Sequence, residues 1–332
     1  MGVQLNHTQI DNVASVLKGA TINPDFLGRE FLHFNADRET KLRVYFLSAA
    51  ICHQTRTLQH PELNLYGWEY MEYGFLQLLH QKNPLLNPGY LSICSNQDVE
   101  GLLKQTFSPD GNPENCTLDR IEERSLMLLD ICRIVKARYG SRISTLIDNA
   151  NGFLVNNGKG LYEILSAFMG FSDPQKKKIT FFIKLAMDAG VINIKDTENL
   201  IPIMDYHMQR VLLRTGCVVV DDPDEMIKLR AKTPVLTDEP IRGKCIAALR
   251  LLSKKSGLEL LSLNDIFWPL GRSCCHETTL CTTGTCAKTP CTLTQTLSLK
   301  THEKCLLQEV CIGSLDESVR SLYEPFVETH YY

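Results

Sequence analysis

The sequence predicts an all-α protein, and three observations carry that prediction. Long stretches repeat apolar side chains at the spacing of one helix face. Strand-like alternation is scarce, and its best example, "GCVVVDD" at residues 216–222, is too short to build a sheet. The predicted helices are joined by short connections rich in Pro and Gly, which is typical of helical bundles.

The predicted helices can be placed by their apolar spacing and their end signals. In chain order they cover residues 8–19, 39–55, 67–81, 96–107, 117–140, 158–170, 173–190 and 205–216. The stretch 39–55 is apolar on nearly all sides, so we expect a buried central helix there. Residues 82–98 and 108–117 are punctuated by Pro, Gly and Asn and are predicted to be connections.

Composition and charge restrict the class of protein. The chain has 332 residues, of which 44% are hydrophobic and 22% charged, as in a soluble globular protein. A formal charge of −3 gives no global basic field for nucleic acid, although a local basic patch is compatible with it. No apolar run reaches the ~18 residues of a membrane helix. We therefore expect no membrane contact and a monomer that is cytoplasmic, or nuclear if the source is eukaryotic.

Asp205 begins the predicted helix of "IPIMDYHMQRVLLRTG", residues 201–216. Pro202 restricts the residue before it to an extended conformation, so a helix can start with Asp205 at its N-cap. A carboxylate at a helix start is usually only a cap. It can also stabilise positive charge, such as that of the oxocarbenium-like transition state of glycosidic cleavage.

A run of three lysines lies about thirty residues upstream, at Lys176, Lys177 and Lys178. Adjacent like charges lower one another's pKa, and a lysine amine with a lowered pKa can attack carbon and form a Schiff base. The same run is also typical of a solvated helix start. The sequence leaves open which of the three lysines has the chemical role.

These two motifs resemble the core of the helix-hairpin-helix DNA glycosylase superfamily, nearest to its archaeal 8-oxoguanine branch. In that family a lysine-bearing hairpin precedes a helix start that "DYHMQRVLLRTG" matches through Asp205, His207, Arg210 and Arg214. The resemblance implies a two-lobed helical bundle with an active cleft between its lobes. It assigns the nucleophile to Lys177 and the catalytic carboxylate to Asp205.

A second stretch, "FLSAAICHQT", resembles the helix end that probes DNA in the same superfamily, and it implies a strand-contacting role for Gln54 beside His53. The phosphate-binding hairpin departs from the family pattern. Its counterpart "MGFSDPQKKKIT" keeps only Gly170 in place, and Pro174 removes a donor. Arg210, Arg214 and His207 are further candidates for contacts with nucleic acid.

The segment after Trp268 is rich in Thr and Cys and too poor in large apolar residues to form a core by itself. Cys275, Cys281, Cys286 and Cys291 are the predicted metal ligands, with Cys274 as an alternative first ligand and no role assigned to Cys305 or Cys311. Four thiolates suit a [4Fe–4S] cluster or zinc. The spacing from Cys274 resembles the opening of the endonuclease III iron–sulfur loop, so iron–sulfur is the first expectation. In a zinc site, His276 or His302 could replace a thiol.

These observations predict a glycosylase-like domain at residues 1–270, a cysteine-rich metal loop at 271–312 and a tail at 313–332. The expected function is a DNA N-glycosylase of base excision repair, with or without lyase activity, that flips a modified base into a pocket. Trp68, Tyr70 and Phe75 could line that pocket or belong to the core. One alternative is an N-glycosidase acting on a modified nucleoside or nucleotide. The other is an inactive, metal-stapled nucleic-acid-binding protein.

Overall fold

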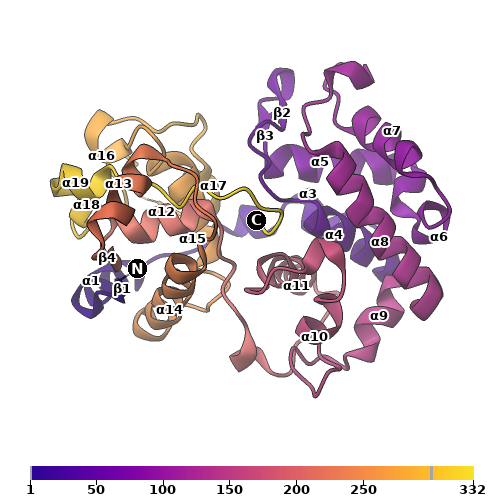
Figure 1. Ribbon diagram of the computed structural model, residues 1–332, viewed down its shortest axis with the longest axis horizontal. Helices are drawn as coiled ribbons and strands as arrows, with labels where there is room; N and C mark the ends of the chain where they lie inside the picture. The colour runs from indigo at the N-terminus through magenta and orange to yellow at the C-terminus, as the bar shows by residue number, and fades with distance from the viewer. Residues whose placement is uncertain (1, 300–301) are drawn as a thin grey trace. The chain divides into compact units, whose positions relative to one another are not determined.

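The computed structural model describes residues 2–299 and 302–332, and it is mostly helical, as predicted. The chain forms two compact units (Figure 1). Unit 1 combines residues 1–28 with residues 201–328, and unit 2 combines residues 29–200 with residues 329–332. The cysteine-rich segment therefore belongs to the same unit as Asp205, whereas the three lysines belong to the other unit.

Unit 2 is built around α4 (Arg38–Ala50), which is the predicted central helix. Its side chains from Val44 to Leu47 are completely buried, because the helix packs against α5, α8, α9 and α11. Asp37 caps the helix by accepting a hydrogen bond from the backbone N–H of Thr40 at 2.7 Å. The helix ends at Ala50, five residues before the end that apolar spacing predicts.

The other helices of unit 2 surround α4. They are α3 (Glu30–His33), α5 (Trp68–His80), α6 (Pro88–Leu91), α7 (Asn96–Thr106), α8 (Ile121–Tyr139), α9 (Ile143–Asn149), α10 (Leu161–Leu165) and α11 (Lys177–Asp188). Five 3₁₀ turns accompany them: η1 (Pro61–Leu63), η2 (Pro84–Leu86), η3 (Pro113–Asn115), η4 (Met169–Phe171) and η5 (Thr197–Asn199). Strands β2 (Gln59–His60) and β3 (Leu65–Tyr66) pair antiparallel. The predicted connection 82–98 contains η2 and α6, which begin at Pro84 and Pro88, because proline suits the first turn of a helix.

Unit 1 has one hydrophobic core shared by both of its chain segments. Strand β1 (Val3–Leu5) pairs antiparallel with β4 (Val218–Val220), with Gln4 opposite Val219. Helix α1 (His7–Leu17) packs on α14 (Glu239–Ser256), and α14 packs on α12 (Tyr206–Arg214). The remaining helices up to residue 274 are α2 (Pro24–Leu27), α13 (Pro223–Ala231), α15 (Asn264–Pro269) and the π-helical turn η6 (Leu270–Cys274).

The cysteine-rich segment forms short helices against this core rather than a core of its own. They are α16 (Leu280–Thr283), α17 (Thr292–Thr296), α18 (Ile312–Leu315) and α19 (Glu317–Arg320). Leu280, Leu293, Leu297 and Leu307 are each at most 3% exposed and insert into the cluster formed by the larger helices. The few large apolar residues of the segment thus anchor it, and its polar loops lie between the anchors.

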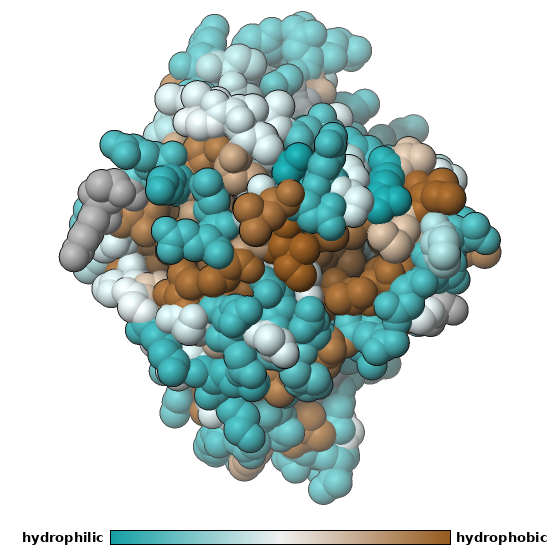
Figure 2. Space-filling view, turned by 90° about the vertical axis from the view of Figure 1, so that its left-hand side faces the viewer, coloured by the Kyte–Doolittle hydropathy of each residue, from teal (hydrophilic) through white to brown (hydrophobic). Residues whose placement is uncertain are grey.

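One face of unit 1 carries apolar side chains among hydrophilic ones (Figure 2). The exposed large apolar residues of this unit are Leu27, Ile227, Leu236, Leu315 and Phe326. Among the described residues, none of the helices combines the length and hydrophobicity that a membrane span requires.

Candidate active site and metal centre

The amine of Lys178 is completely buried in unit 2. Lys178 lies in the first turn of α11, and its Nζ donates to the carbonyl oxygen of Ala50 at 2.6 Å. The same Nζ lies 3.0 Å from Nδ1 of His53. Burial lowers the pKa of Lys178 to about 7, and the positive charges of Lys177 and Arg124 contribute to the shift. A substantial fraction of this amine is therefore neutral, and so nucleophilic, near neutral pH.

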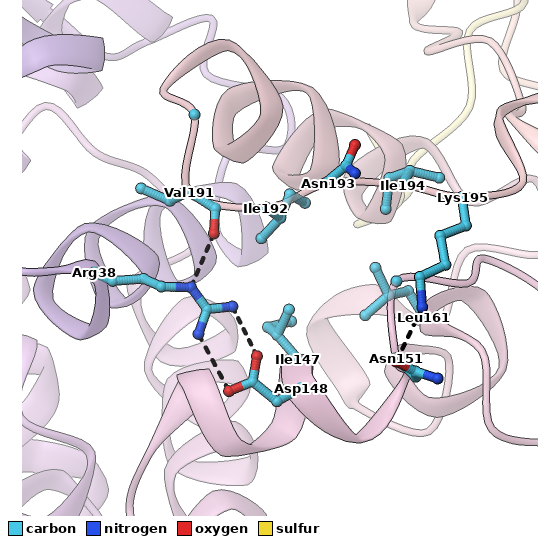
Figure 3. Close-up of a pocket in the computed structure, with 12 residues that line it drawn as sticks. Arg38, Ile147, Asp148, Asn151, Leu161, Val191, Ile192, Asn193, Ile194 and Lys195 are labelled. Carbon is cyan, nitrogen blue, oxygen red and sulfur yellow. Dashed lines mark hydrogen bonds and ion pairs between the residues drawn. The ribbon is translucent and has the colours of Figure 1, made fainter.

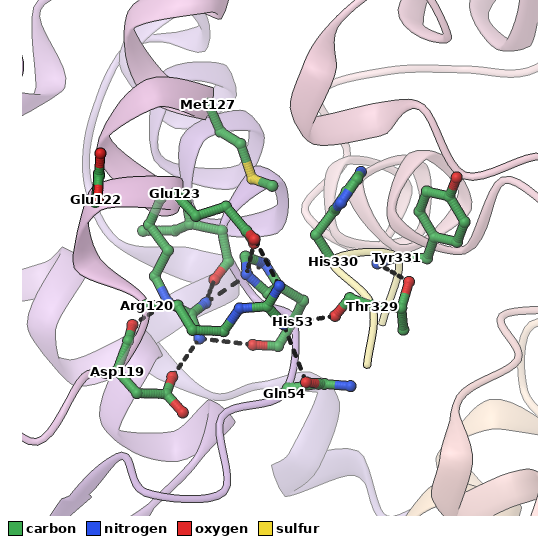
Figure 4. A network of polar contacts seen from close by, with 12 residues as sticks. His53, Gln54, Asp119, Arg120, Glu122, Glu123, Met127, Thr329, His330 and Tyr331 are labelled. Carbon is green, nitrogen blue, oxygen red and sulfur yellow. Dashed lines mark hydrogen bonds and ion pairs between the residues drawn. The ribbon is translucent and has the colours of Figure 1, made fainter. Parts of the chain in front are cut away.

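His53 links this buried amine to the carboxylate of Glu123 (Figure 4). Burial lowers the pKa of His53 strongly, and Lys178 and Arg124 lower it further, so the imidazole is neutral. Its Nε2 lies 2.8 Å from Oε1 of Glu123, whose side chain is 27% exposed. The imidazole thus lies between the buried amine and the carboxylate, at 3.0 Å from the first and 2.8 Å from the second.

Two arginines of α8 and its N-cap surround these three groups. Arg124 is fully buried and donates to the carbonyl oxygen of His53 at 2.8 Å and to Oδ1 of Asp119 at 2.8 Å. Arg120 pairs with Glu123 at 2.5 Å and donates to Oε1 of Gln54 at 3.0 Å. The predicted strand-probing residue Gln54 is therefore held within unit 2.

Three non-glycine residues of this region adopt left-handed backbone conformations. The φ angles are 42° for Gln54, 50° for Arg120 and 62° for Lys176. Each such residue costs of the order of 1 kcal/mol, and such strain clusters at functional sites. Three of the nine described non-glycine residues with positive φ thus lie beside the Lys178 network.

Residues 329–332 lie beside the same network. The carbonyl oxygen of Thr329 accepts from Arg120 at 2.8 Å, and that of Tyr332 accepts from the backbone N–H of Gln54 at 3.2 Å. His330 lies 3.0 Å from the hydroxyl of Ser172. Burial lowers the pKa of His330, and the positive charge of Lys178 lowers it further. His330 is thus a second neutral imidazole in the electrostatic field of the buried amine.

In the hairpin before α11, the carboxylate of Asp173 occupies the backbone N–H donors. Asp173 is 1% exposed, and its carboxylate accepts from the backbone N–H groups of Gln175 at 3.0 Å and of Lys177 at 2.8 Å. These donors would otherwise be available to a phosphate. Gly170 is buried, and a Cβ at this position would lie 3.2 Å from Cβ of Ala50, so this glycine permits close packing.

The two other lysines have different surroundings. Lys177, the predicted nucleophile, is 8% exposed, and its Nζ lies 3.5 Å from Sγ of Cys52 and 5.2 Å from the ring centre of Phe181. Lys176 is half-buried and donates to the hydroxyl of Ser166 at 2.7 Å. Of the predicted pocket aromatics, Tyr70 and Phe75 are at most 1% exposed and belong to the core, whereas Trp68 is half-buried.

In unit 1, Asp205 is the N-cap of α12, as the sequence predicts. Its Oδ1 accepts from the backbone N–H of Met208 at 3.0 Å, and the residue is 7% exposed. The cap holds the carboxylate at the positive end of the helix dipole. Asp205 is therefore buried and held in a fixed orientation at the start of α12.

Arg210 and Arg214 face the interior of unit 1, whereas the sequence predicts that these two arginines contact nucleic acid. Both are at most 3% exposed. Arg210 pairs with Glu324 at 2.6 Å, donates to the carbonyl oxygen of Cys275 at 2.9 Å and lies 3.0 Å from Nδ1 of His207. Arg214 donates to the carbonyl oxygens of Leu322 at 2.7 Å and His276 at 2.7 Å. These guanidinium groups tie α12 to the cysteine-rich segment.

Three thiols and one imidazole of unit 1 converge in a candidate metal centre. The ligand atoms of Cys274, Cys286, Cys291 and His302 all lie within 4.8 Å of one another. Sγ of Cys274 is 3.7 Å from that of Cys286 and 3.6 Å from that of Cys291, and Nε2 of His302 is 3.0 Å from Sγ of Cys286. The four residues are thus close enough to hold a metal ion.

The electrostatics of this group favour a bound cation. Hydrogen bonds from the thiols of Cys274 and Cys286 lower the pKa of Cys291 to about 5, so this sulfur is a thiolate at neutral pH. The nearby sulfur of Cys291 raises the pKa of Cys274, and burial raises it further. A cation would offset the repulsion that keeps the other thiols protonated.

The ligand set differs in part from the predicted one. Cys286 and Cys291 are among the predicted ligands, and Cys274 was the alternative to Cys275. The described structure does not bring Cys275 or Cys281 into this group. Cys275 instead lies beside Arg214, at 3.7 Å from Nη1 to Sγ, and Sγ of Cys281 donates to the hydroxyl of Thr279 at 3.4 Å.

A separate pocket of about 530 Å³ lies in unit 2 and contains none of the predicted site residues (Figure 3). Arg38 forms a bidentate pair with Asp148 across it, at 2.8 and 3.2 Å. Lys195 donates to Oδ1 of Asn151 at 3.1 Å. The charged side chains Arg38, Asp148 and Lys195 of this pocket thus each have a polar partner within unit 2.

The sequence contains a signal for Lys178 that the lysine run alone does not give. Phe182 and Leu185 follow Lys178 by four and seven residues and are buried, so Lys178 lies on the apolar face of α11. The corresponding positions after Lys177 are the half-buried Phe181 and the charged Lys184. His330 carries no comparable signal, because it follows Lys178 by 152 residues in the chain.

Comparison with protein-family models and with curated proteins finds no match to this chain. The family resemblance described from the motifs therefore stays a prediction.

We predict that burial of Lys178 makes the stability of the protein depend on pH. Because its folded-state pKa of about 7 is below its unfolded value of 10.5, the unfolded state binds more protons between these two values. Relative to Lys178→Met, the unfolding free energy of the wild type should rise with pH in that window. The slope should reach up to about 1.4 kcal/mol per pH unit.

Denaturant unfolding of both proteins at a series of pH values measures this difference, because groups that do not interact with Lys178 titrate alike in the two proteins. Lys176→Met is the matched control, since that lysine is only half-buried. A difference between wild type and Lys178→Met that is constant or falls from pH 7 to pH 10 would contradict the prediction.

Proposed function

We propose that the protein is an N-glycosidase of the helix-hairpin-helix glycosylase type that uses a lysine amine. The observation that carries the proposal is the buried Lys178, whose pKa of about 7 suits a nucleophile at neutral pH. It lies 3.0 Å from the imidazole of His53, which lies 2.8 Å from the carboxylate of Glu123, and such groupings of titratable side chains are typical of catalytic sites. We assign the nucleophilic role to Lys178 in place of the predicted Lys177.

The proposed reaction breaks the bond between a modified base and C1′ of its sugar. The neutral amine of Lys178 attacks C1′, and the base leaves with the bonding electrons. The base takes up one proton, and the amine loses one, for which His53 and Glu123 provide a route. The sugar ring of this adduct then opens at the bond between C1′ and O4′, and O4′ takes up a proton as the nitrogen forms an iminium with C1′. Water hydrolyses the iminium, so that the sugar is released and the amine is restored.

Asp205, in unit 1, stays the carboxylate that the sequence predicts for a reaction of this type. Positive charge develops on the sugar as the glycosidic bond breaks, and a fixed anion stabilises it. The N-cap hydrogen bond to Met208 keeps the carboxylate oriented without a conformational change.

A modified nucleoside or nucleotide is a better-supported substrate than duplex DNA. Asp173 occupies the hairpin donors that would bind a DNA phosphate, and its negative charge would repel one. Arg210 and Arg214 are engaged inside unit 1. The formal charge of −3 also gives no general attraction to a polyanion. We therefore favour a small substrate over the DNA glycosylase predicted first.

We predict that the purified protein releases free base from at least one member of a panel of modified nucleosides and nucleotides. Borohydride should trap a sugar adduct on Lys178. Lys178→Gln should lower the rate by about 100-fold or more, as loss of a catalytic group does. Mass spectrometry identifies the released base and the modified lysine, and the rate should rise to a plateau as the pH passes about 7.

Lys176→Gln and Lys177→Gln are the matched controls, because each removes one charge from the same run. An adduct on Lys177 would overturn the assignment to Lys178. Release of base from duplex DNA in preference to small substrates would restore the DNA glycosylase. The absence of release from every substrate would overturn the enzymatic proposal and favour an inactive binding protein.

We further propose that the centre at Cys274, Cys286, Cys291 and His302 binds one zinc ion. With Zn–S bonds of about 2.3 Å, tetrahedral geometry separates two sulfur ligands by about 3.8 Å. The distances of 3.6 and 3.7 Å from Cys274 are close to that value. A mononuclear Cys₃His site is thus a better match than the [4Fe–4S] cluster predicted first. Its binding energy would help to fold the cysteine-rich segment.

We predict that the purified protein is colourless and contains zinc but no iron. Cys286→Ser combined with His302→Ala should remove about one zinc per chain, because only two of the four ligands remain. Elemental analysis measures the content, and Cys94→Ser, which alters a thiol of unit 2, should leave it unchanged. Brown protein that contains iron and sulfide would contradict the zinc assignment.

A further inference from the structure

The thiol of Cys52 and the amine of Lys177 face each other inside unit 2. Nζ of Lys177 lies 3.5 Å from Sγ of Cys52, and each residue is 8% exposed. Cys52 is a free cysteine without a disulfide bond. The proposed glycosidase reaction uses neither group, so the two form a second pair of nucleophilic side chains beside Lys178.

The packing of two helices holds this pair together. Cys52 follows the end of α4 by two residues, and Lys177 is the first residue of α11, which packs on α4. Beside the pair, Nζ of Lys178 donates to the carbonyl oxygen of Ala50 at 2.6 Å. The backbone N–H of Lys177 donates to Asp173 at 2.8 Å. The backbone is therefore anchored on both sides, and the sulfur and nitrogen atoms stay within reach of each other.

Positive charge surrounds the sulfur atom of Cys52. Besides Lys177, the side chains of Lys178 and Arg124 interact with it electrostatically. Cysteines in positive surroundings that keep some contact with solvent are the ones that react with oxidants. The exposed fraction of Cys52 leaves part of the residue open to an oxidant as small as hydrogen peroxide.

Cys132 of the same unit provides a contrast. It is completely buried in α8, and burial raises its pKa to about 12. A thiol that stays protonated and out of contact with solvent is inert. The chemistry expected of Cys52 is therefore a property of its surroundings and not of cysteines in this unit generally.

The neighbouring amine determines what an oxidised Cys52 can form. A sulfenic acid condenses with a second thiol to a disulfide, or with a nitrogen to a sulfenamide. The described polar contact of Cys52 is with an amine and not with a second thiol. The geometry therefore favours a bond between sulfur and nitrogen.

We propose that Cys52 is a site of oxidation by peroxides and that its oxidised sulfur becomes cross-linked to Nζ of Lys177. The sulfur attacks one oxygen of hydrogen peroxide, the O–O bond breaks, and the other oxygen leaves with the thiol proton as water. The nitrogen of Lys177 then attacks the sulfenic acid at sulfur. The S–O bond breaks, and hydroxide leaves with one proton of the amine as water. The sulfur is oxidised, the peroxide is reduced to water, and the product is a sulfenamide.

A thiol compound reverses the cross-link. Its thiolate attacks the sulfur of Cys52, the S–N bond breaks, and the amine of Lys177 leaves with a proton. A second thiol then reduces the mixed disulfide and restores Cys52. While the bond exists, it joins the end of α4 to the first turn of α11.

Peptide mass spectrometry of the full-length chain tests the proposal without any substrate, so the result does not depend on the proposed glycosidase. The native protein is treated with hydrogen peroxide, its free thiols are blocked with N-ethylmaleimide, and it is then digested. A joined pair of peptides that contains Cys52 and Lys177 should appear, lighter than the sum of the two peptides by two hydrogen atoms. Dithiothreitol should abolish it. In a denaturing gel the oxidised chain should migrate faster until a thiol is added, because a closed loop makes the unfolded chain more compact.

Lys176→Gln is the matched control, because it removes a half-buried lysine of the same run and should leave the cross-link intact. Lys177→Gln and Cys52→Ser should each abolish it. Cys132 is an internal control that does not depend on the folding of a variant, since it should stay unmodified in the native wild type. A bond from Cys52 to another residue, oxidation of Cys52 to a sulfinic or sulfonic acid without a cross-link, or a Cys52 that stays reduced would each overturn the proposal.

Discussion

Burial of the Lys178 amine is the constraint on which the organisation of unit 2 depends. An ammonium group in a protein interior is costly, so it must be paired or lose its proton. Here the end of α4 supplies the carbonyl oxygen of Ala50 and the neutral imidazole of His53. Helix α8 supplies Arg124, which adds positive charge and so favours the neutral amine. The central helix, the long helix and the lysine helix are thus coupled through one nitrogen atom.

In unit 1 the buried guanidinium groups of Arg210 and Arg214 hold the helices and the cysteine-rich segment together. Arg210 and Arg214 reach the backbone of the cysteine-rich segment and bring it against the helix that Asp205 caps. A buried guanidinium is stable only with such partners. If metal ions order the cysteine-rich segment, they also fix the environment of α12. Metal binding and the position of the proposed carboxylate are then linked within this unit.

The all-α class, the buried central helix and the cap at Asp205 could be predicted because each depends on local spacing or capping chemistry. The burial of Arg210 and Arg214 could not, because an i, i+4 pair of arginines is usually solvated and only tertiary contacts reverse this. Sequence proximity also favoured Cys275 and Cys281 as ligands. Chain folding brings the distant His302 to Cys274 and turns Cys275 away. The choice of Lys178 over Lys177 depends on which lysine lies on the buried face of α11, and three consecutive lysines do not show this.

The most direct test of the central claim is a nuclear magnetic resonance titration of lysine side chains labelled with ¹³C at Cε. The Lys178 resonance, assigned by its absence in Lys178→Gln, should titrate with a midpoint of about 7. Such a midpoint would show that the buried amine is available as a nucleophile at neutral pH. A midpoint near the ordinary lysine value of 10.5 would mean that Lys178 stays charged and cannot have the proposed role.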